Sequence, residues 1–258
     1  MYSLTLLTAM KKTPAYIAAH IRRVLINGAS APHTEEVQRF FKEEIQSRGW
    51  YTNELRKVAV RLRKATLQDA DLKFLIAVCD KLFRGRVLEE KVFAVFMLQG
   101  LTDEFGDREF KLFSSWLDRI STWADHDALA SYLLGPMIAA DPKRAKTVFR
   151  WAKSRDRWHK RAAAVSLIRA IRQKKCRSEV VEVSNLLLDD KDDMVQKGLG
   201  WLLREAAKYD TEFTVPYLTR IRDRASRLVL RTACETLSPA ESAKILTRTA
   251  RVIASGAR

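Results

Sequence analysis

Trp123 and Asp127 stand four residues apart in the segment STWADHD, a spacing that places both side chains on one face of a helix. Thr122 fits the N-cap of that helix, and Asp125 stands where a carboxylate accepts the first unpaired amides. Asp127 has no such capping role. A carboxylate beside an indole attracts a cation through its charge and through the negative face of the ring. The alternative is a packed tryptophan with a solvated aspartate.

The segment QKGLGWLLRE, residues 196–205, predicts a helix that contains two glycines. Each interior glycine disfavours a helix by roughly 1 kcal/mol relative to alanine. Gly198 and Gly200 therefore indicate close approach to the backbone, either by an external partner or by a neighbouring helix. One helical face carries two cations and an indole, namely Lys197, Trp201 and Arg204. Such a face suits an anionic polymer.

A second basic segment, DRWHKRAAAV, begins about one helical pair earlier, at Asp156. Its cations share one side of the predicted helix and are Arg157, Lys160 and Arg161. The alanines that follow favour tight helix packing, and Trp158 is predicted to lie in the core. Basic faces on successive helical layers can follow a phosphate backbone, although a solvated charged face is the alternative.

The composition narrows the class of partner. The chain has 258 residues, a hydrophobic content of 47% and a net charge of +16, which favours nucleic acid, an anionic membrane or an acidic protein. No apolar run approaches the roughly 20 residues of a membrane-spanning helix. The three cysteines and four histidines show no disulfide or metal-ligand spacing, so we expect no metal and no cofactor. A reducing compartment, the cytoplasm, fits best, with organellar targeting by the basic N-terminus as the minor alternative.

Apolar residues recur every three or four positions and glycine and proline are few, which predicts an all-α chain without strands. An N-terminal helix is expected to begin at Pro14 and to end near Gly28. The other expected helices are Glu35–Ser47, Asn53–Lys64, Asp69–Leu82, Leu88–Glu104, Arg108–Ile120, Trp123–Leu134, Pro142–Lys153, Asp156–Gln173, Ser178–Leu188, Asp192–Lys208, Glu212–Asp223, Ala225–Thr236 and Pro239–Ser255.

Short connections between these helices predict antiparallel pairs, and a row of such pairs is an α-solenoid. The helices expected to begin at Asp156, Asp192 and Ala225 are spaced as two-helix repeats of HEAT length, with a globular bundle as the alternative. We expect a basic N-terminal segment at residues 1–32. Residues 33–258 are expected to form one curved repeat domain with a basic concave face.

Taken together, Trp123-x-x-x-Asp127, the WHKRAA stretch from Trp158 and the KGLGWLLRE stretch from Lys197 resemble the AlkD type of DNA alkylation repair protein. The resemblance runs from about Glu35 to the C-terminus. It implies HEAT-like repeats and a DNA glycosylase that removes positively charged N3- and N7-alkylated purines, such as 3-methyladenine and 7-methylguanine, from double-stranded DNA. It also implies a monomer that engages the lesion without flipping the base into a tight pocket.

The resemblance also implies site residues. Trp123 and Trp201 match the aromatic residues that contact the sugar of the lesion, and Asp127 matches the catalytic carboxylate. Arg161 and Arg204 match basic residues near the DNA backbone, beside which Lys160, Lys197 and Arg157 are expected to meet phosphates. Phe40 takes the place of an aromatic residue that is usually tyrosine, and a phenyl ring can stack but cannot donate a hydroxyl hydrogen bond.

Two other classes of function are compatible with the sequence. A non-catalytic helical-repeat module would bind nucleic acid or an acidic protein through the same basic face, with no special role for Asp127. Peripheral membrane binding through the basic N-terminal helix is the third reading.

Overall fold

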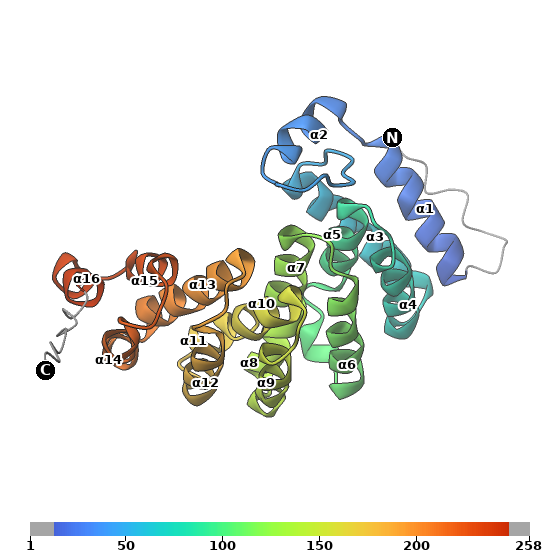
Figure 1. The fold of residues 1–258 in the computed structure, drawn as a ribbon. Helices are drawn as coiled ribbons and strands as arrows, with labels where there is room; N and C mark the ends of the chain where they lie inside the picture. The colour runs from blue at the N-terminus through green and yellow to red at the C-terminus, as the bar shows by residue number, and fades with distance from the viewer. Residues whose placement is uncertain (1–12, 248–258) are drawn as a thin grey trace, which may run out of the picture. The chain divides into compact units, whose positions relative to one another are not determined.

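The computed structural model describes residues 13–247, and no strand occurs within that range. The prediction of an all-α chain is therefore confirmed. The chain divides into two compact units, Met1–Leu133 and Leu134–Arg258, which we describe separately (Figure 1). The last helix is predicted to extend to Ser255, and residues 248–255 of that prediction lie outside the described residues.

The first unit is built around α5, whose residues from Phe93 to Leu98 are all buried. Helices α3, α4 and α7 pack against α5, and α1 packs on α4 through a buried stripe that includes Ile17, Ile21 and Leu25. The helices of this unit are α1 (Pro14–Asn27), α2 (Ala31–Gln38), α3 (Thr52–Asp69), α4 (Leu72–Phe83), α5 (Leu88–Leu98), η1 (Thr102–Glu104), α6 (Asp107–Ser115), η2 (Trp116–Arg119) and α7 (Trp123–Leu129).

The second unit is a stack of antiparallel helical pairs. Helices α10, α13 and α15 form one layer, and α9 and α12 pack together on its other side, whereas α16 packs against both α15 and α14 (Figure 1). The helices are η3 (Ala130–Leu134), which crosses the unit boundary, then α8 (Gly135–Ala140), η4 (Pro142–Ala145), α9 (Lys146–Ala152), α10 (Arg157–Val165), α11 (Ile168–Ile171), α12 (Arg177–Leu187), α13 (Asp193–Tyr209), α14 (Thr211–Ile221), α15 (Arg227–Cys234) and α16 (Pro239–Leu246).

Contacts between residues one repeat apart hold this stack together. Arg172 Nε donates to Glu205 Oε2 at 2.7 Å, and Arg177 Nε donates to Asp210 Oδ2 at 2.6 Å, each across 33 residues of sequence. Such a regular separation is typical of stacked two-helix repeats and argues against a globular bundle for this unit. The repeat spacing read from the sequence is confirmed. The curvature of the whole chain and its concave face remain predictions.

The helix predicted at Glu35–Ser47 is wrong, because α2 ends at Gln38 and an irregular segment, residues 39–51, follows. The side chain of Gln38 takes the place of helical hydrogen bonds: its amide donates to Glu43 O at 2.9 Å and its carbonyl accepts from Ile45 N at 3.1 Å. The buried carboxylate of Glu89 on α5 then accepts hydrogen bonds from Ser47 Oγ and from the amides of residues 48–50. The segment is thus fixed by side chains and not by its own helix.

The helix α8 is missing from the sequence prediction. Gly135 and Pro136 suggest an interruption after Leu134, but proline is accepted in the first turn of a helix, where no amide is needed. Here α7 passes through the π-helical turn η3 into α8, and Pro136 lies in the first turn of α8.

Candidate functional site

The first turn of α7 is fixed by a buried polar network. Thr122 and Asp125 form the predicted capping box, and Asp125 Oδ1 accepts from the Thr122 amide at 2.7 Å. Asp125 Oδ2 accepts from the Ser121 amide and pairs with Lys91 Nζ of α5, both at 3.0 Å. Since both Asp125 and Lys91 are buried, the charge of each is offset by the other. Asp125 therefore has a structural role, as its position in the sequence indicates.

Trp123, the first residue of α7, is half-buried and stacks on Phe41. The ring centroids are 4.9 Å apart and the planes differ by 14°. Phe40, the aromatic residue singled out in the sequence, is 74% exposed. The contact with Trp123 thus comes from the next residue, Phe41, which the sequence does not single out because the predicted helix Glu35–Ser47 includes both phenylalanines.

Asp127 lies one turn after Trp123, and 21% of its side chain is exposed. Its Oδ1 atom is 2.7 Å from Nδ1 of His126, whose side chain is completely buried. The carboxylate of Asp127 is thus partly exposed to solvent and contacts a buried polar side chain, His126. In the sequence this histidine carries no signal, because it lacks metal-ligand spacing.

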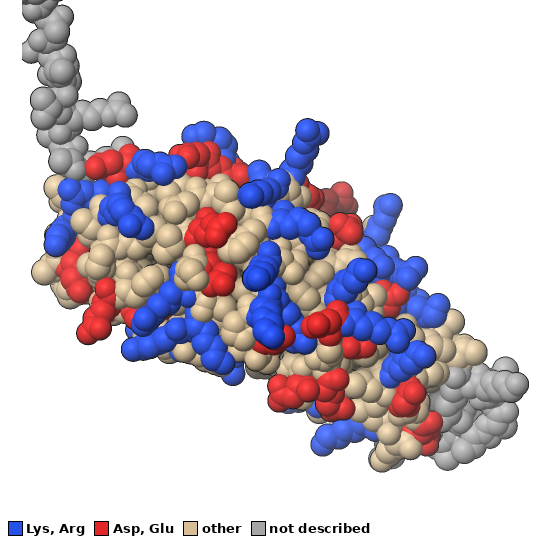
Figure 2. All heavy atoms as spheres, turned by 90° about the horizontal axis from the view of Figure 1, so that it is seen from below, with Lys and Arg blue, Asp and Glu red and all other residues tan. Residues whose placement is uncertain are grey.

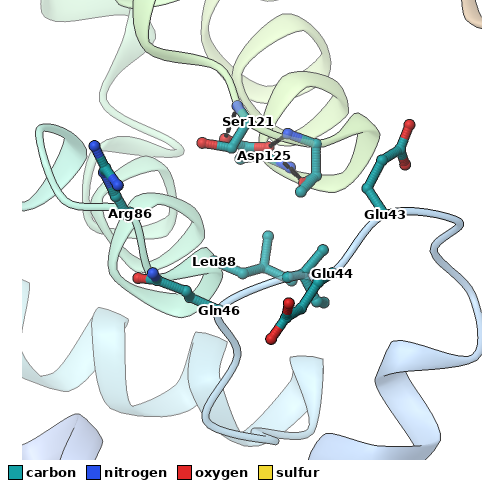
Figure 3. Close-up of a pocket in the computed structure, with 9 residues that line it drawn as sticks. Glu43, Glu44, Gln46, Arg86, Leu88, Ser121 and Asp125 are labelled. Carbon is teal, nitrogen blue, oxygen red and sulfur yellow. Dashed lines mark hydrogen bonds between the residues drawn. The ribbon is translucent and has the colours of Figure 1, made fainter.

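A small cavity of about 240 Å³ opens beside the N-terminus of α7 (Figure 3). Residues 43–46 of the irregular segment and residues 121–122 line it, together with Arg86, Leu88 and Asp125. Figure 3 shows the hydrogen bond that fastens Asp125 to Ser121. Neither Trp123 nor Asp127 is among its lining residues, and the Asp125 carboxylate is occupied by structural hydrogen bonds.

In the second unit, α10 and α13 lie side by side and carry the predicted phosphate-binding residues. Arg161 is only 6% exposed, and its Nη1 donates to Met194 O at 2.6 Å. A Cβ atom added to Gly198 would lie 3.0 Å from Cγ of Arg161, and one added to Gly200 would lie 3.0 Å from Cβ of Thr232 on α15. Both glycines therefore let neighbouring helices pack against α13.

The other predicted phosphate-binding cations each contact a carboxylate. Lys160 Nζ lies 2.7 Å from Asp190, and Lys197 Nζ lies 2.8 Å from Asp193. Arg157 pairs with Asp192 at 3.0 Å, and Arg204 pairs with Glu235 at 2.8 Å. On the face shown in Figure 2, Lys and Arg side chains are interspersed with Asp and Glu side chains. The charge of these four cations is thus partly compensated within the protein.

The titration of Asp190 follows from its surroundings. Partial burial raises the pKa of this carboxyl, but hydrogen bonds from Lys160 and from the Asp192 amide lower the pKa by more, so that it lies below the usual value. The carboxylate is therefore ionised at neutral pH, and its pair with Lys160 persists there.

Trp158 on α10 and Trp201 on α13 are both half-buried. Trp158 is less buried than predicted, and the guanidinium of Arg157 lies 5.3 Å from its ring centroid. Trp201 follows Gly200 on α13, on the helix that also carries Lys197 and Arg204.

Each unit brings part of the predicted site together. Trp123 and Asp127 share α7 in the first unit, whereas the predicted cations and Trp201 share α10 and α13 in the second. Among residues 13–247, no cluster of three or more His, Cys, Asp or Glu side chains could hold a metal ion. None of the helices within this range is both long and apolar enough to cross a membrane.

Comparison with known proteins identifies the family. The sequence profile of the DNA alkylation repair enzymes matches residues 21–237. No curated protein matches the chain. A predicted DNA alkylation repair enzyme from Enterococcus faecalis is similar in structure, with a TM-score of 0.73 at 16% identity over 82% of this chain and 97% of that one.

Two structures from Streptococcus mutans share the fold. AlkD2 matches with a TM-score of 0.59 at 15% identity, over 86% of this chain and 98% of its own. The protein smu.31 from strain UA159 matches with a TM-score of 0.52 at 16% identity, over 71% of this chain and 100% of its own. The profile match covers both units, including α7, α10 and α13. The chain therefore belongs to the DNA alkylation repair enzyme family.

Proposed function

We propose that the chain is a DNA glycosylase that hydrolyses the N-glycosidic bond of positively charged N3- and N7-alkylated purines in duplex DNA. The observation that carries this proposal is the placement of Trp123 and the part-exposed Asp127 one turn apart on α7. Phe41 supports the indole from one side, and the capping box with Asp125 fixes the helix start. Asp125 supplies the carboxylate that caps the helix, a role that Asp127 does not share.

The residue types suit this reaction. An N3- or N7-alkylpurine already carries positive charge, so it leaves without a general acid, and the developing oxocarbenium sugar and the attacking water remain to be managed. Asp127 would stabilise the cationic sugar electrostatically and orient water, while the indole of Trp123 favours a cationic sugar over a neutral one. Removal of one such group costs on the order of 3 kcal/mol, or a hundredfold in rate.

The partner in this proposal is double-stranded DNA, bound by a monomer without a cofactor. Trp201 contacts the sugar of the lesion as Trp123 does, and Phe40 stacks at the DNA surface with its exposed ring. The predicted phosphate contacts are Arg161, Arg204, Lys160, Lys197 and Arg157. Because several of these residues carry carboxylate partners, DNA phosphates would compete with those carboxylates for them.

Substrate selection in this mechanism depends on the charge of the base and on its lability as a leaving group. The enzyme should therefore release 7-methylguanine and 3-methyladenine, and bulky cationic adducts as well, but not neutral lesions. Chromatography of bases released from duplexes with a single lesion measures this directly. Excision of hypoxanthine as fast as 7-methylguanine would contradict selection by charge.

A further inference from the structure

His126 is a polar side chain that packing alone does not explain. It is completely buried in α7, and its Nδ1 atom lies 2.7 Å from Asp127 Oδ1. Adjacent residues on a helix normally point about 100° apart and do not face each other. The two side chains must therefore turn toward each other, and this arrangement restricts the rotamers of Asp127.

The chemistry of the contact determines which of the two atoms carries the shared hydrogen. An ionised carboxylate only accepts hydrogen bonds, so Nδ1 of His126 must carry the hydrogen that it shares with Asp127 Oδ1. An imidazole that donates from Nδ1 holds the carboxylate in place through one of its two oxygens. That is what a group that stabilises a cationic sugar requires.

The helix that carries the pair is itself fixed. On its N-terminal side, the buried Asp125 accepts from Lys91 Nζ and caps the helix together with Thr122. These contacts anchor the backbone that precedes His126 and Asp127, so the direction of the Asp127 carboxylate depends on its side-chain partners.

We propose that His126 is a positioning residue that orients the Asp127 carboxylate toward the sugar of the lesion nucleotide. This inference rests on the proposed glycosylase function. It assigns His126 no contact with DNA, so its loss should slow the chemical step and leave DNA affinity unchanged.

The test compares His126→Leu, which removes the donor, with His126→Asn, whose amide nitrogen can replace Nδ1. Under single-turnover conditions, His126→Leu should release 7-methylguanine on the order of 10- to 100-fold more slowly, and His126→Asn should restore most of the rate. The matched control is His33→Leu, which removes an imidazole 2.8 Å from the carboxylate of Glu36 and should keep the wild-type rate.

Two further measurements separate positioning from a structural role. In an Asp127→Asn background, His126→Leu should cause no further loss of rate, whereas an equal loss in both backgrounds would overturn the proposal. Nitrogen-15 NMR of the wild type should show a protonated Nδ1 of His126 whose shift changes in Asp127→Asn. An unprotonated Nδ1 would overturn the proposal even if the leucine variant fails to fold.

Failure of the glycosylase proposal can be distinguished from failure of the positioning role of His126. In that case the wild type releases no 7-methylguanine at all, and His126 has no excision step to support. If the wild type excises the base and His126→Leu does so at the same rate, only the positioning role is wrong.

Discussion

Two carboxylates two residues apart have opposite surroundings. Asp125 is completely buried and pairs with Lys91, while Asp127 reaches solvent. Asp125→Asn leaves a buried ammonium without its counter-charge, so we expect a loss of about 3 to 5 kcal/mol in the free energy of unfolding. Urea denaturation measures this loss. Asp103→Asn, at an exposed carboxylate of the same unit, is the matched control and should unfold as the wild type does. A similar stability for Asp125→Asn and the wild type would contradict the structural role of Asp125.

The sequence predicts these two roles because capping depends on local spacing. It does not predict that Phe41 stacks on Trp123 while Phe40 is exposed, because that difference depends on where α2 ends. The end of α2 depends in turn on Gln38, and the segment after it depends on the buried Glu89, which accepts a hydrogen bond from the Arg48 amide across 41 residues of sequence. His126 is also unrecognisable from sequence, because a single histidine in an apolar helix is usually a core residue.

At the scale of helices, the two glycines of α13 both allow close helix packing, but they should differ in how well they tolerate replacement by alanine. A Cβ at Gly200 meets Cβ of Thr232, which moves only with the backbone of α15, whereas a Cβ at Gly198 meets the longer side chain of Arg161. Gly200→Ala should therefore lower the free energy of unfolding by about 1 to 3 kcal/mol despite the better helix propensity of alanine. Gly198→Ala should lower it by less.

Thermal or urea denaturation of the two variants measures this difference, and DNA affinity provides the second readout. Since Gly200 faces Thr232 of α15, Gly200→Ala should not weaken DNA binding while it remains folded. If Gly200→Ala were as stable as the wild type but bound DNA poorly, the glycines would serve DNA approach instead of helix packing.

Helix starts are predicted better than helix ends. The sequence predicts that repeats begin at Asp156 and Asp192, and each is the N-cap of its helix and accepts two amide hydrogen bonds. The ends of helices, and the passage from α7 through η3 into α8, depend on tertiary packing. Sequence periodicity alone cannot locate them.

At the scale of the whole molecule, a net charge of +16 coexists with extensive internal ion pairing. Arg204 lies 2.8 Å from the exposed carboxylate of Glu235. If Arg204 binds phosphate, Glu235→Gln removes a competitor for its guanidinium. DNA should then bind up to about 5-fold more tightly, which corresponds to the roughly 1 kcal/mol that an exposed ion pair contributes at most. Glu212→Gln, at another exposed glutamate, is the control.

The salt dependence of the DNA dissociation constant checks the same prediction. Loss of one phosphate contact in Arg204→Ala should reduce the slope of log affinity against log salt by about 1. A slope that is the same for the wild type and Arg204→Ala, together with no gain of affinity in Glu235→Gln, would show that Arg204 does not contact phosphate.

The most direct test of the proposed function is single-turnover release of 7-methylguanine from a duplex with one lesion, measured for the wild type, Asp127→Asn and Asp103→Asn, together with the affinity of each for DNA. We predict that the wild type and Asp103→Asn release the base at equal rates. Asp127→Asn should bind DNA equally well but release the base at least about a hundredfold more slowly. Equal release by the wild type and Asp127→Asn, or no release above spontaneous depurination by the wild type, would contradict catalysis by Asp127.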